Sequence, residues 1–364
     1  MAVWKTSCTG EPGDRGILRS ADYERGLTRV RRVVSSAPAR SEDRQQALDG
    51  EVKLTTLLSS RLVLVTGKGG TGKTSLSAAI GIMSAKQGRR TLIVEVDNFH
   101  PSLTRLFGTK PVYTPRPVSD NLFICNLTWM SALKDWLKAT VKSRRITRLI
   151  LDNRMATVFL DATPGAREIV ILSKIISLME DFDQVVVDLP ASGHALGILR
   201  VPRTATRLMR SGPVREKAEQ ILEVFRESST SLAIIGLPEE MVVNETLELW
   251  EKIHREVPEI QAPKIFLNRS SPPSLTADEV SLLGRLEAAS LDDPAAAELL
   301  QAGRWEEELE RATAEALERL QESMGDEVVT FPRLGALGGF ARGPAKVVEQ
   351  MSKALSRQQL REAR

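Results

Sequence analysis

The chain has 364 residues, enough for one large domain or two small ones, and its 42% apolar content supports a full hydrophobic core. Its formal net charge of +3 is small, so we expect no stable nucleic-acid complex. The two cysteines, Cys8 and Cys125, lie far apart, which excludes a zinc knuckle or redox pair built on C-x-x-C. No apolar run approaches transmembrane length and residues 1–16 lack a signal core, so we expect no integral membrane segment and a cytoplasmic location.

Residues 1–58 differ in composition from the rest of the chain. They are rich in Arg, Ser, Asp and Glu, and their few apolar residues follow no period, so we predict a disordered N-terminal extension. Two other interpretations stay open: translated sequence upstream of the true start, or a functional basic arm around residues 25–34. Residues 59–364 are predicted to form one domain.

The most informative stretch, residues 66–75, matches the phosphate-binding pattern G-x-x-x-x-G-K-[ST]. A strand-like run at 62–65 precedes it and a helical pattern at 75–86 follows it, which is the context that such a loop needs. Glycines let backbone N–H groups turn towards phosphate oxygens, and the following helix adds its positive end. Lys73 is expected to reach the β- and γ-phosphates, and the Thr74 hydroxyl to ligate Mg²⁺. The loop residues predicted to bind nucleotide are Gly67, Lys68, Gly69, Gly70, Thr71, Gly72, Lys73, Thr74 and Ser75.

Downstream, strand-like runs alternate with helical patterns. Further strands are predicted at 91–96, 122–127, 183–188, 232–237, 264–267 and 327–331. Helices are predicted around 133–141, at 167–180, 214–225 and 244–256, throughout 275–324, and from about 344 to 360. This alternation predicts an α/β fold, a mostly parallel, doubly wound P-loop NTPase sheet covered on both faces. Helical insertions at about 130–180, 200–228 and 275–324 are expected to form a helical subdomain.

Polar residues stand where several predicted strands end. Besides the phosphate loop, these are Asp97, Asp188, the stretch 238–240 and Asn268. Because the carboxyl ends of parallel strands meet at one edge of a sheet, we expect these residues to share one site.

Lys68 follows the first glycine of the loop, where an ordinary phosphate-binding loop does not require a lysine. The run Lys-Gly-Gly-Thr-Gly-Lys-Thr resembles the deviant Walker A motif of the ArsA, MinD, ParA and nitrogenase-iron-protein group. Four further stretches, in order along the chain, resemble motifs of the ArsA-type (arsenical pump and tail-anchored-protein targeting) ATPases: 164–168, 187–196, 237–246 and 265–269. The resemblance extends from residue 61 to about 350.

This resemblance implies Mg²⁺-dependent ATP hydrolysis that switches a homodimer, or a heterodimer with a related ATPase, acting on an unidentified protein client. It implies that Lys68 crosses the dimer interface to the partner's nucleotide, so Lys68, Lys73 and Asp97 are the expected catalytic residues. Asp97 would orient the attacking water near Mg²⁺, and Asp188 would hold Mg²⁺ through water. The expected metal residues are thus Thr74, Asp97 and Asp188.

The remaining assignments also come from the resemblance. Gly193 and His194 match switch II, which senses the γ-phosphate, and Asn268 matches the asparagine that contacts adenine. A GTPase would carry an aspartate where Ser271 stands, which favours ATP.

Two alternative functions stay open. An arsenite-pump ATPase would need several thiols, because As(III) binds thiolate sulfur, and the chain has only two cysteines. A MinD- or ParA-like positioning ATPase would act at a membrane or nucleoid. The weak apolar stripe Val347, Val348, Met351 and Leu355 is the candidate membrane helix, although we interpret it as core packing. The basic stretches 134–148 and 200–217 are interpreted as solvated helix faces, with docking of an acidic partner as the alternative.

Overall fold

In a computed structural model of the chain, the structure describes residues 54–96, 101–141, 143, 145, 149, 151–153, 165–260, 263–288, 294–324, 328–333, 348–349 and 351–355. Residues 1–53, which make up most of the predicted extension, and residues 97–100, which include Asp97, lie outside the described residues.

The described strands form one eight-stranded sheet in the order β3-β4-β2-β5-β1-β6-β7-β8. The strands are β1 (Leu62–Gly67), β2 (Thr91–Val96), β3 (Arg116–Ser119), β4 (Leu122–Leu127), β5 (Gln184–Asp188), β6 (Thr230–Gly236), β7 (Lys264–Ser270) and β8 (Val328–Pro332). All neighbouring pairs are parallel except β3–β4. Every residue of β1, β2, β5 and β6 is buried, as expected for parallel strands covered on both faces. The predicted fold class is confirmed.

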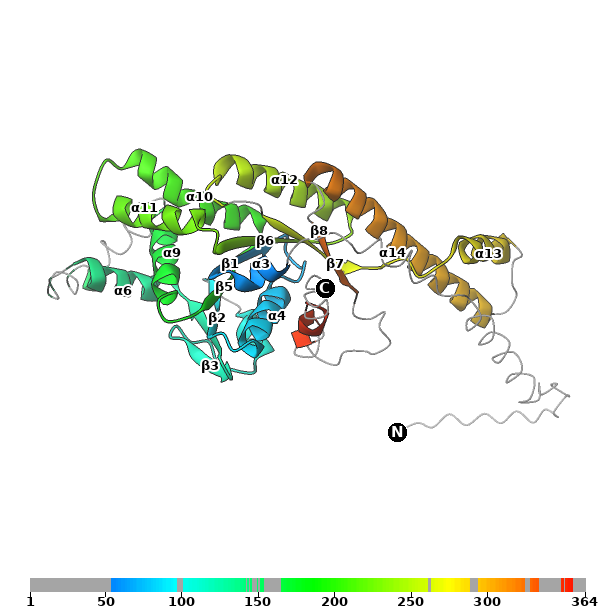
Figure 1. Ribbon diagram of the computed structural model, residues 1–364, viewed down its shortest axis with the longest axis horizontal. Helices are drawn as coiled ribbons and strands as arrows, with labels where there is room; N and C mark the ends of the chain where they lie inside the picture. Colours follow the sequence, from blue (N-terminus) through cyan, green and yellow to red (C-terminus); the bar gives the residue numbers. More distant parts are fainter. Residues whose placement is uncertain are drawn as a thin grey trace, which may run out of the picture. The chain divides into compact units, whose positions relative to one another are not determined.

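Helices cover both faces of the sheet (Figure 1). Apolar residues of α3 (Leu54–Ser59), α4 (Lys73–Lys86) and α5 (Ser102–Leu106) pack in one core cluster. The opposite cluster receives α9 (Ala166–Leu178), α10 (Ser192–Leu208), α11 (Pro213–Arg226), α12 (Glu240–Glu256) and α14 (Pro294–Met324). The helix α6 (Trp129–Thr140) packs on α9, and α13 (Ala277–Ala288) packs on α14. The boundary predicted at residue 58 falls inside α3, because Leu57 and Leu58 are buried beside α4.

Four described elements were not predicted individually from the sequence: α3, α5, β3 and α10. The edge strand β3 is largely exposed and contains Pro117, so it carries neither an apolar run nor an alternating pattern. The helix α10 continues through Pro202, a residue that normally ends a helix. Its apolar residues, including Ala195 and Leu199, are fully buried against the sheet, and this packing outweighs the local preference.

Within the predicted helical stretch 275–324, the sequence has the spacing of a packed helix pair at Trp305, Leu309, Ala312, Ala316 and Leu320. This predicted apolar stripe is only partly buried. Ala316 and Leu320 reach the core, but Trp305 is 60% exposed, so its predicted packing is wrong. The reason is that the first part of α14 extends beyond the sheet, where α13 accompanies it (Figure 1). The indole of Trp305 lies instead beside the guanidinium of Arg333, 5.1 Å from the ring centre.

The C-terminal stripe confirms the core-packing interpretation where the structure describes it. Val348, Met351 and Leu355 are buried in the same cluster as α4. These side chains are therefore occupied in packing and do not form a free membrane-binding face.

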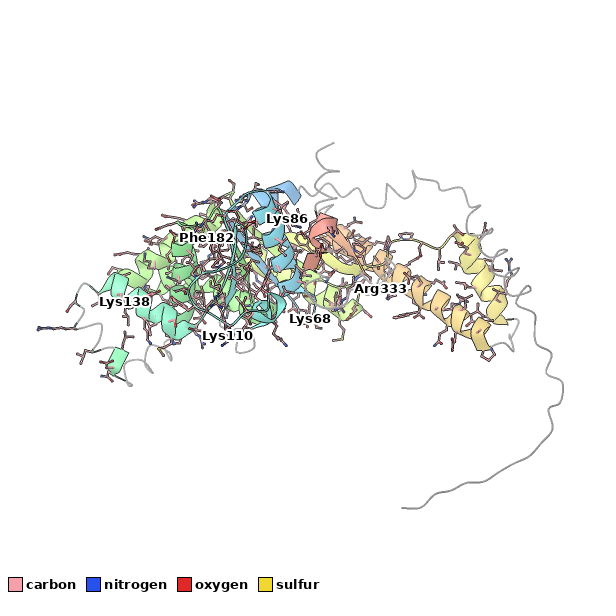
Figure 2. The ribbon with its side chains drawn as sticks, turned by 90° about the horizontal axis from the view of Figure 1, so that it is seen from below. Lys68, Lys86, Lys110, Lys138, Phe182 and Arg333 are labelled. Atoms are coloured by element: carbon pink, nitrogen blue, oxygen red, sulfur yellow. The ribbon has the colours of Figure 1, made fainter. Side chains whose placement is uncertain are left out.

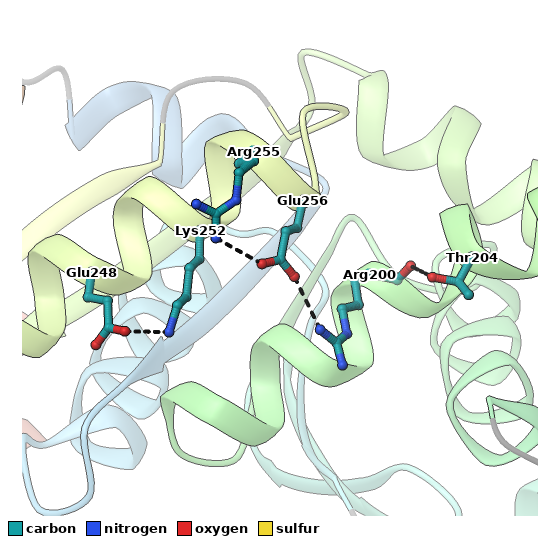
Figure 3. A network of polar contacts seen from close by, with 6 residues as sticks. All are labelled: Arg200, Thr204, Glu248, Lys252, Arg255 and Glu256. Carbon is teal, nitrogen blue, oxygen red and sulfur yellow. Dashed lines mark hydrogen bonds and ion pairs between the residues drawn. The ribbon is translucent and has the colours of Figure 1, made fainter.

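Much of the positive charge on α10 and α11 is paired within the chain. Arg200 of α10 contacts Glu256 of α12 at 3.2 Å, beside the pair Lys252–Glu248 (Figure 3). Arg203 and Arg226 both approach Glu259, at 3.9 and 3.7 Å. The exposed pairs of Glu256 and Glu248 contribute about 0–1 kcal/mol each, whereas the side chain of Glu259 is only 9% exposed. This pairing within the chain favours the interpretation of solvated helix faces over docking of an acidic partner.

Candidate nucleotide-binding site

The loop between β1 and α4 has the backbone shape of a phosphate cradle. Gly67, Gly70 and Gly72 have φ values of 146°, 84° and 101°, a region that other residues rarely adopt. A Cβ at Gly67 would lie 2.2 Å from the carbonyl oxygen of Ile235, so this position also excludes any side chain. The helix α4 begins at Lys73, directly after the loop, and its free N–H groups therefore face the cradle.

Side chains brace the loop from three directions. The Thr71 hydroxyl and the Lys73 ammonium donate to the carbonyl oxygen of Lys68, at 2.9 and 3.0 Å. The Asn268 amide, at the end of β7, donates to the carbonyl oxygen of Thr71 at 2.8 Å. Asn268 therefore contacts the loop directly, and a Cβ at Gly72 would lie 2.6 Å from its amide nitrogen.

Asp188 ends β5 beneath the first turn of α4. Its carboxylate accepts a 2.6 Å hydrogen bond from Thr74 and a weak 3.5 Å contact from Ser77. Burial raises the pKa of the Asp188 carboxyl to about 6; the Thr74 hydrogen bond opposes this rise and the charge of Glu95 adds to it. Burial also lowers the pKa of the Lys73 ammonium, an effect that the charge of Asp188 partly opposes.

This donor set fits a magnesium nucleotide. A hydroxyl and a carboxylate oxygen stand together, and such hard oxygen ligands are those that Mg²⁺ prefers. Asp188 is 6% exposed and carries a pKa raised by burial, so a nearby cation would relieve the cost of its charge. The glycine loop and Lys73 supply the positive groups that a polyphosphate requires.

Lys68 is oriented differently from Lys73. Its ammonium pairs with Glu245 of α12 at 3.2 Å, and the two side chains are 31% and 42% exposed. Figure 2 labels Lys68 among the side chains of the described residues.

The predicted switch II residues lie at the start of α10. Gly193 and His194 are both exposed in its first turn. The short segment 189–191 connects the end of β5 at Asp188 to this helix. The exposure of His194 excludes a packing role for its ring. The hydroxyl of Thr66 in β1 donates to the carbonyl oxygen of Pro190 at 3.2 Å, which ties this segment to the strand that leads into the loop.

The sequence interpretation assigned no role to two residues that complete this geometry. Ser77 lies one helical turn after Thr74, and that spacing was the available signal for its contact with Asp188. Glu245 lies in the stretch 237–246, which resembles an ArsA-type motif. Its pairing with Lys68 depends on how α12 packs, so no local sequence pattern could have predicted it.

A family model for anion-transporting ATPases, the ArsA ATPases, matches residues 60–255, more than half of the chain. The chain belongs to the ArsA ATPase family. It is therefore an ATPase, as the family resemblance implied.

Named relatives of this ArsA-family ATPase come from bacteria and plants. ATPase BagA of Mycobacterium tuberculosis is 27% identical over 261 residues, which cover 67% of this chain and 74% of BagA. Putative arsenical pump-driving ATPase 2 of Aquifex aeolicus is 27% identical over 179 residues, 47% of this chain and 58% of that protein. ATPase GET3C of Arabidopsis thaliana is 24% identical over 269 residues, 58% of this chain and 67% of that protein.

Among the helices that the structure describes, none combines the length and apolarity needed to cross a bilayer.

Proposed function

We propose that this ArsA-family ATPase hydrolyses Mg²⁺–ATP as a homodimer, or as a heterodimer with a related ATPase, and that the nucleotide switches the dimer to act on a protein client. The orientation of Lys68 carries this proposal. Its ammonium is partly exposed and paired with α12 rather than directed into its own loop. A lysine held there can reach the nucleotide of a second subunit without distorting the loop that it leaves.

Within one subunit, we assign the phosphates to the loop N–H groups and Lys73, and Mg²⁺ to Thr74, Asp97 and Asp188. Bound Mg²⁺ would supply positive charge at the β- and γ-phosphate oxygens. Lys73 would stabilise the negative charge that develops on the transferred group, because its ammonium emerges at the N-terminus of α4.

The remaining residues of the proposed site orient the reactants. Asp97 would hold the attacking water in line with the scissile bond. Gly193 and His194 would respond to the γ-phosphate, and Asn268 would contact adenine while it braces Thr71.

Driving an arsenical pump is a second candidate, favoured by the name of the Aquifex aeolicus relative. Its chemistry requires accessible thiolates. Cys125 is 3% exposed, and burial raises the pKa of its thiol to about 12, so it cannot serve as such a ligand. Cys8 lies outside the described residues. We therefore favour a protein client.

The test is the mass of the purified protein by light scattering, with and without Mg²⁺–ATP, alongside phosphate release. We expect the wild type to dimerise with ATP and to hydrolyse it, and Lys68→Ala to lose both. Lys86→Ala, which removes an exposed lysine from the last turn of α4, is the matched control and should behave as wild type (Figure 2). A Lys68→Ala monomer that turns over at the wild-type rate would overturn the proposal.

A further inference from the structure

A buried carboxylate that the proposed mechanism does not use stands beside the site. Glu95 interrupts the otherwise uncharged strand β2 and is 2% exposed. Burying a carboxylate is strongly unfavourable unless hydrogen bonds or opposite charges compensate. Such a residue in the interior of a parallel sheet therefore calls for a specific set of partners.

Two backbone partners of Glu95 lie at the start of α5. One carboxylate oxygen accepts the backbone N–H of Ser102 at 2.7 Å, and the other lies 3.4 Å from the N–H of Leu103. Pro101, which precedes α5, has no side-chain acceptor with which to cap these groups. Glu95 thus performs from β2 the capping that the local sequence lacks. Leu103 is 1% exposed, so the helix start is also anchored in the core.

The same residue borders the metal-binding residues of the proposed site. In the sheet, Glu95 of β2 is in register with Asp188 of β5, so both side chains lie on the face that α4 covers. The influence of the Glu95 charge on Asp188 is consistent with this proximity. Val96 and Pro101 are the described residues closest to Asp97 in the sequence. Val96 directly follows Glu95, and Pro101 directly precedes Ser102, whose N–H Glu95 accepts.

We infer that Glu95 is a positioning residue of the ATPase: its carboxylate fixes the first turn of α5 against the end of β2, and so fixes Val96 and Pro101, the described residues between which Asp97 stands in the sequence. The inference rests on the role proposed for Asp97. It predicts that loss of the contacts between Glu95 and α5 slows turnover but leaves nucleotide affinity intact, because the phosphate loop and Lys73 do not depend on these contacts.

The experiment compares kcat and KM for ATP, the affinity for ADP and the unfolding temperature in a small set of variants. Glu95→Gln keeps the side-chain volume and one acceptor oxygen, and should lower kcat about tenfold. Glu95→Ala removes both acceptors and should lower kcat about 100-fold. In both variants KM for ATP and the Kd for ADP should stay within about threefold of wild type, since misplaced groups affect the reaction more than binding.

Two reference variants make the result decisive. Gln184→Ala removes a buried polar group from the opposite end of β5, where its amide donates to carbonyl oxygens of Leu57, Leu58 and Ser60. It should lower the unfolding temperature with unchanged kcat, and thereby reports what a purely structural loss does. Asp97→Asn reports the role of Asp97 itself.

The inference is wrong if both Glu95 variants keep wild-type kcat while Asp97→Asn loses turnover. It is also wrong if kcat of the Glu95 variants falls only as far as their lower unfolding temperature explains, with Gln184→Ala as the reference for a purely structural loss. If Asp97→Asn itself turns over at the wild-type rate, the proposed role of Asp97 fails first, which is a distinguishable result. Should Glu95→Ala not fold, Glu95→Gln alone decides, since its volume is preserved.

Discussion

The two ends of the central strands are built for different purposes. At the amino ends, polar side chains saturate backbone carbonyls: Gln184 donates to three of them, and the Arg89 guanidinium donates to Leu58, Ser60 and Asp183. At the carboxyl ends, burial raises the pKa of Asp188 and lowers that of Lys73, and three glycines hold positive φ values. At the amino ends these side chains serve the chain's own backbone carbonyls, whereas the carboxyl ends keep charged groups that a bound nucleotide would satisfy.

This contrast teaches where stability and activity should separate. Changes at the carboxyl ends should reduce activity without reducing the stability of the nucleotide-free protein, and changes at the amino ends should do the reverse. Each of the following predictions tests one side of that contrast.

Lys73→Ala should have the largest effect, a loss of about 100- to 1000-fold in kcat, because it removes a positive group from the transferred phosphate. The unfolding temperature should hardly change, since burial already disfavours the charged ammonium in the nucleotide-free protein. Phosphate release and thermal unfolding measure the two effects. If Lys73→Ala retained half of the wild-type turnover, Lys73 would have no catalytic role.

Asp188→Asn should stabilise the metal-free protein while it abolishes turnover. Burial raises the folded-state pKa of Asp188 to about 6, from the ordinary value of 3.8 for an aspartate. Below about pH 4 the carboxyl is neutral in both states, and above about pH 6 only the folded state bears the cost of a buried charge. The contribution of Asp188 to the free energy of unfolding therefore falls by about 3 kcal/mol as pH rises between these values.

Chemical unfolding in EDTA at about pH 5 and pH 8 checks this sign. The gain in Asp188→Asn should be larger at the higher pH, because the asparagine still accepts the Thr74 hydrogen bond but never ionises. Asp181→Asn, at an exposed position on the turn before β5, should show no such difference. Equal pH slopes for Asp188→Asn and wild type would contradict the prediction.

Gln184→Ala should destabilise the protein by about 1–3 kcal/mol, because it leaves buried carbonyl oxygens without their donor. At a temperature well below its own unfolding transition, kcat should match wild type. Denaturant unfolding and phosphate release give the two numbers. A turnover defect in the fully folded variant would mean that the amino ends of the strands also shape the site.

Glu245→Gln should have the smallest effect. It releases Lys68 from a partly exposed pair worth about 0–1 kcal/mol, so ATP-dependent dimerisation should tighten by at most about fivefold for each of the two lysines in the dimer. Glu248→Gln, on the same helix, breaks the pair with Lys252 instead and is the matched control. Analytical ultracentrifugation with Mg²⁺–ATP measures the dimer dissociation constant. A weaker dimer in Glu245→Gln than in wild type would contradict the account.

Much of the fold and part of the site follow from local patterns. Continuous apolar runs predicted the central parallel strands, since strands covered on both faces need no polar alternation. The glycine spacing predicted the loop because glycine is required at its φ values. Thr74 and Asp188 were predicted as residues of one magnesium site, and the structure brings their side chains into a direct 2.6 Å hydrogen bond.

The rest depended on contacts between distant parts of the chain. Pro202 inside α10 could not be anticipated, because tertiary packing decided the helix. Gln184 reaches carbonyls 124 to 127 residues away, and no local pattern encodes that reach. Glu95 did leave a signal, a lone charge in an apolar strand, but its partners on α5 became evident only from the structure.

The most direct test of the trans role of Lys68 is subunit complementation. Lys68→Ala and Lys73→Ala proteins, each inactive alone, are mixed in equal amounts with Mg²⁺–ATP, and phosphate release is measured. If Lys68 acts across the interface, the Lys68→Ala subunit of a mixed dimer keeps its own Lys73 and receives Lys68 from its partner. One site in each mixed dimer then works, so activity should recover to at most about a quarter of wild type, the value for random pairing, and to less if the loss of one Lys68 weakens the mixed dimer. If the mixture stays as inactive as its components although mixed dimers form, Lys68 does not act in trans and the dimer-switch account is wrong.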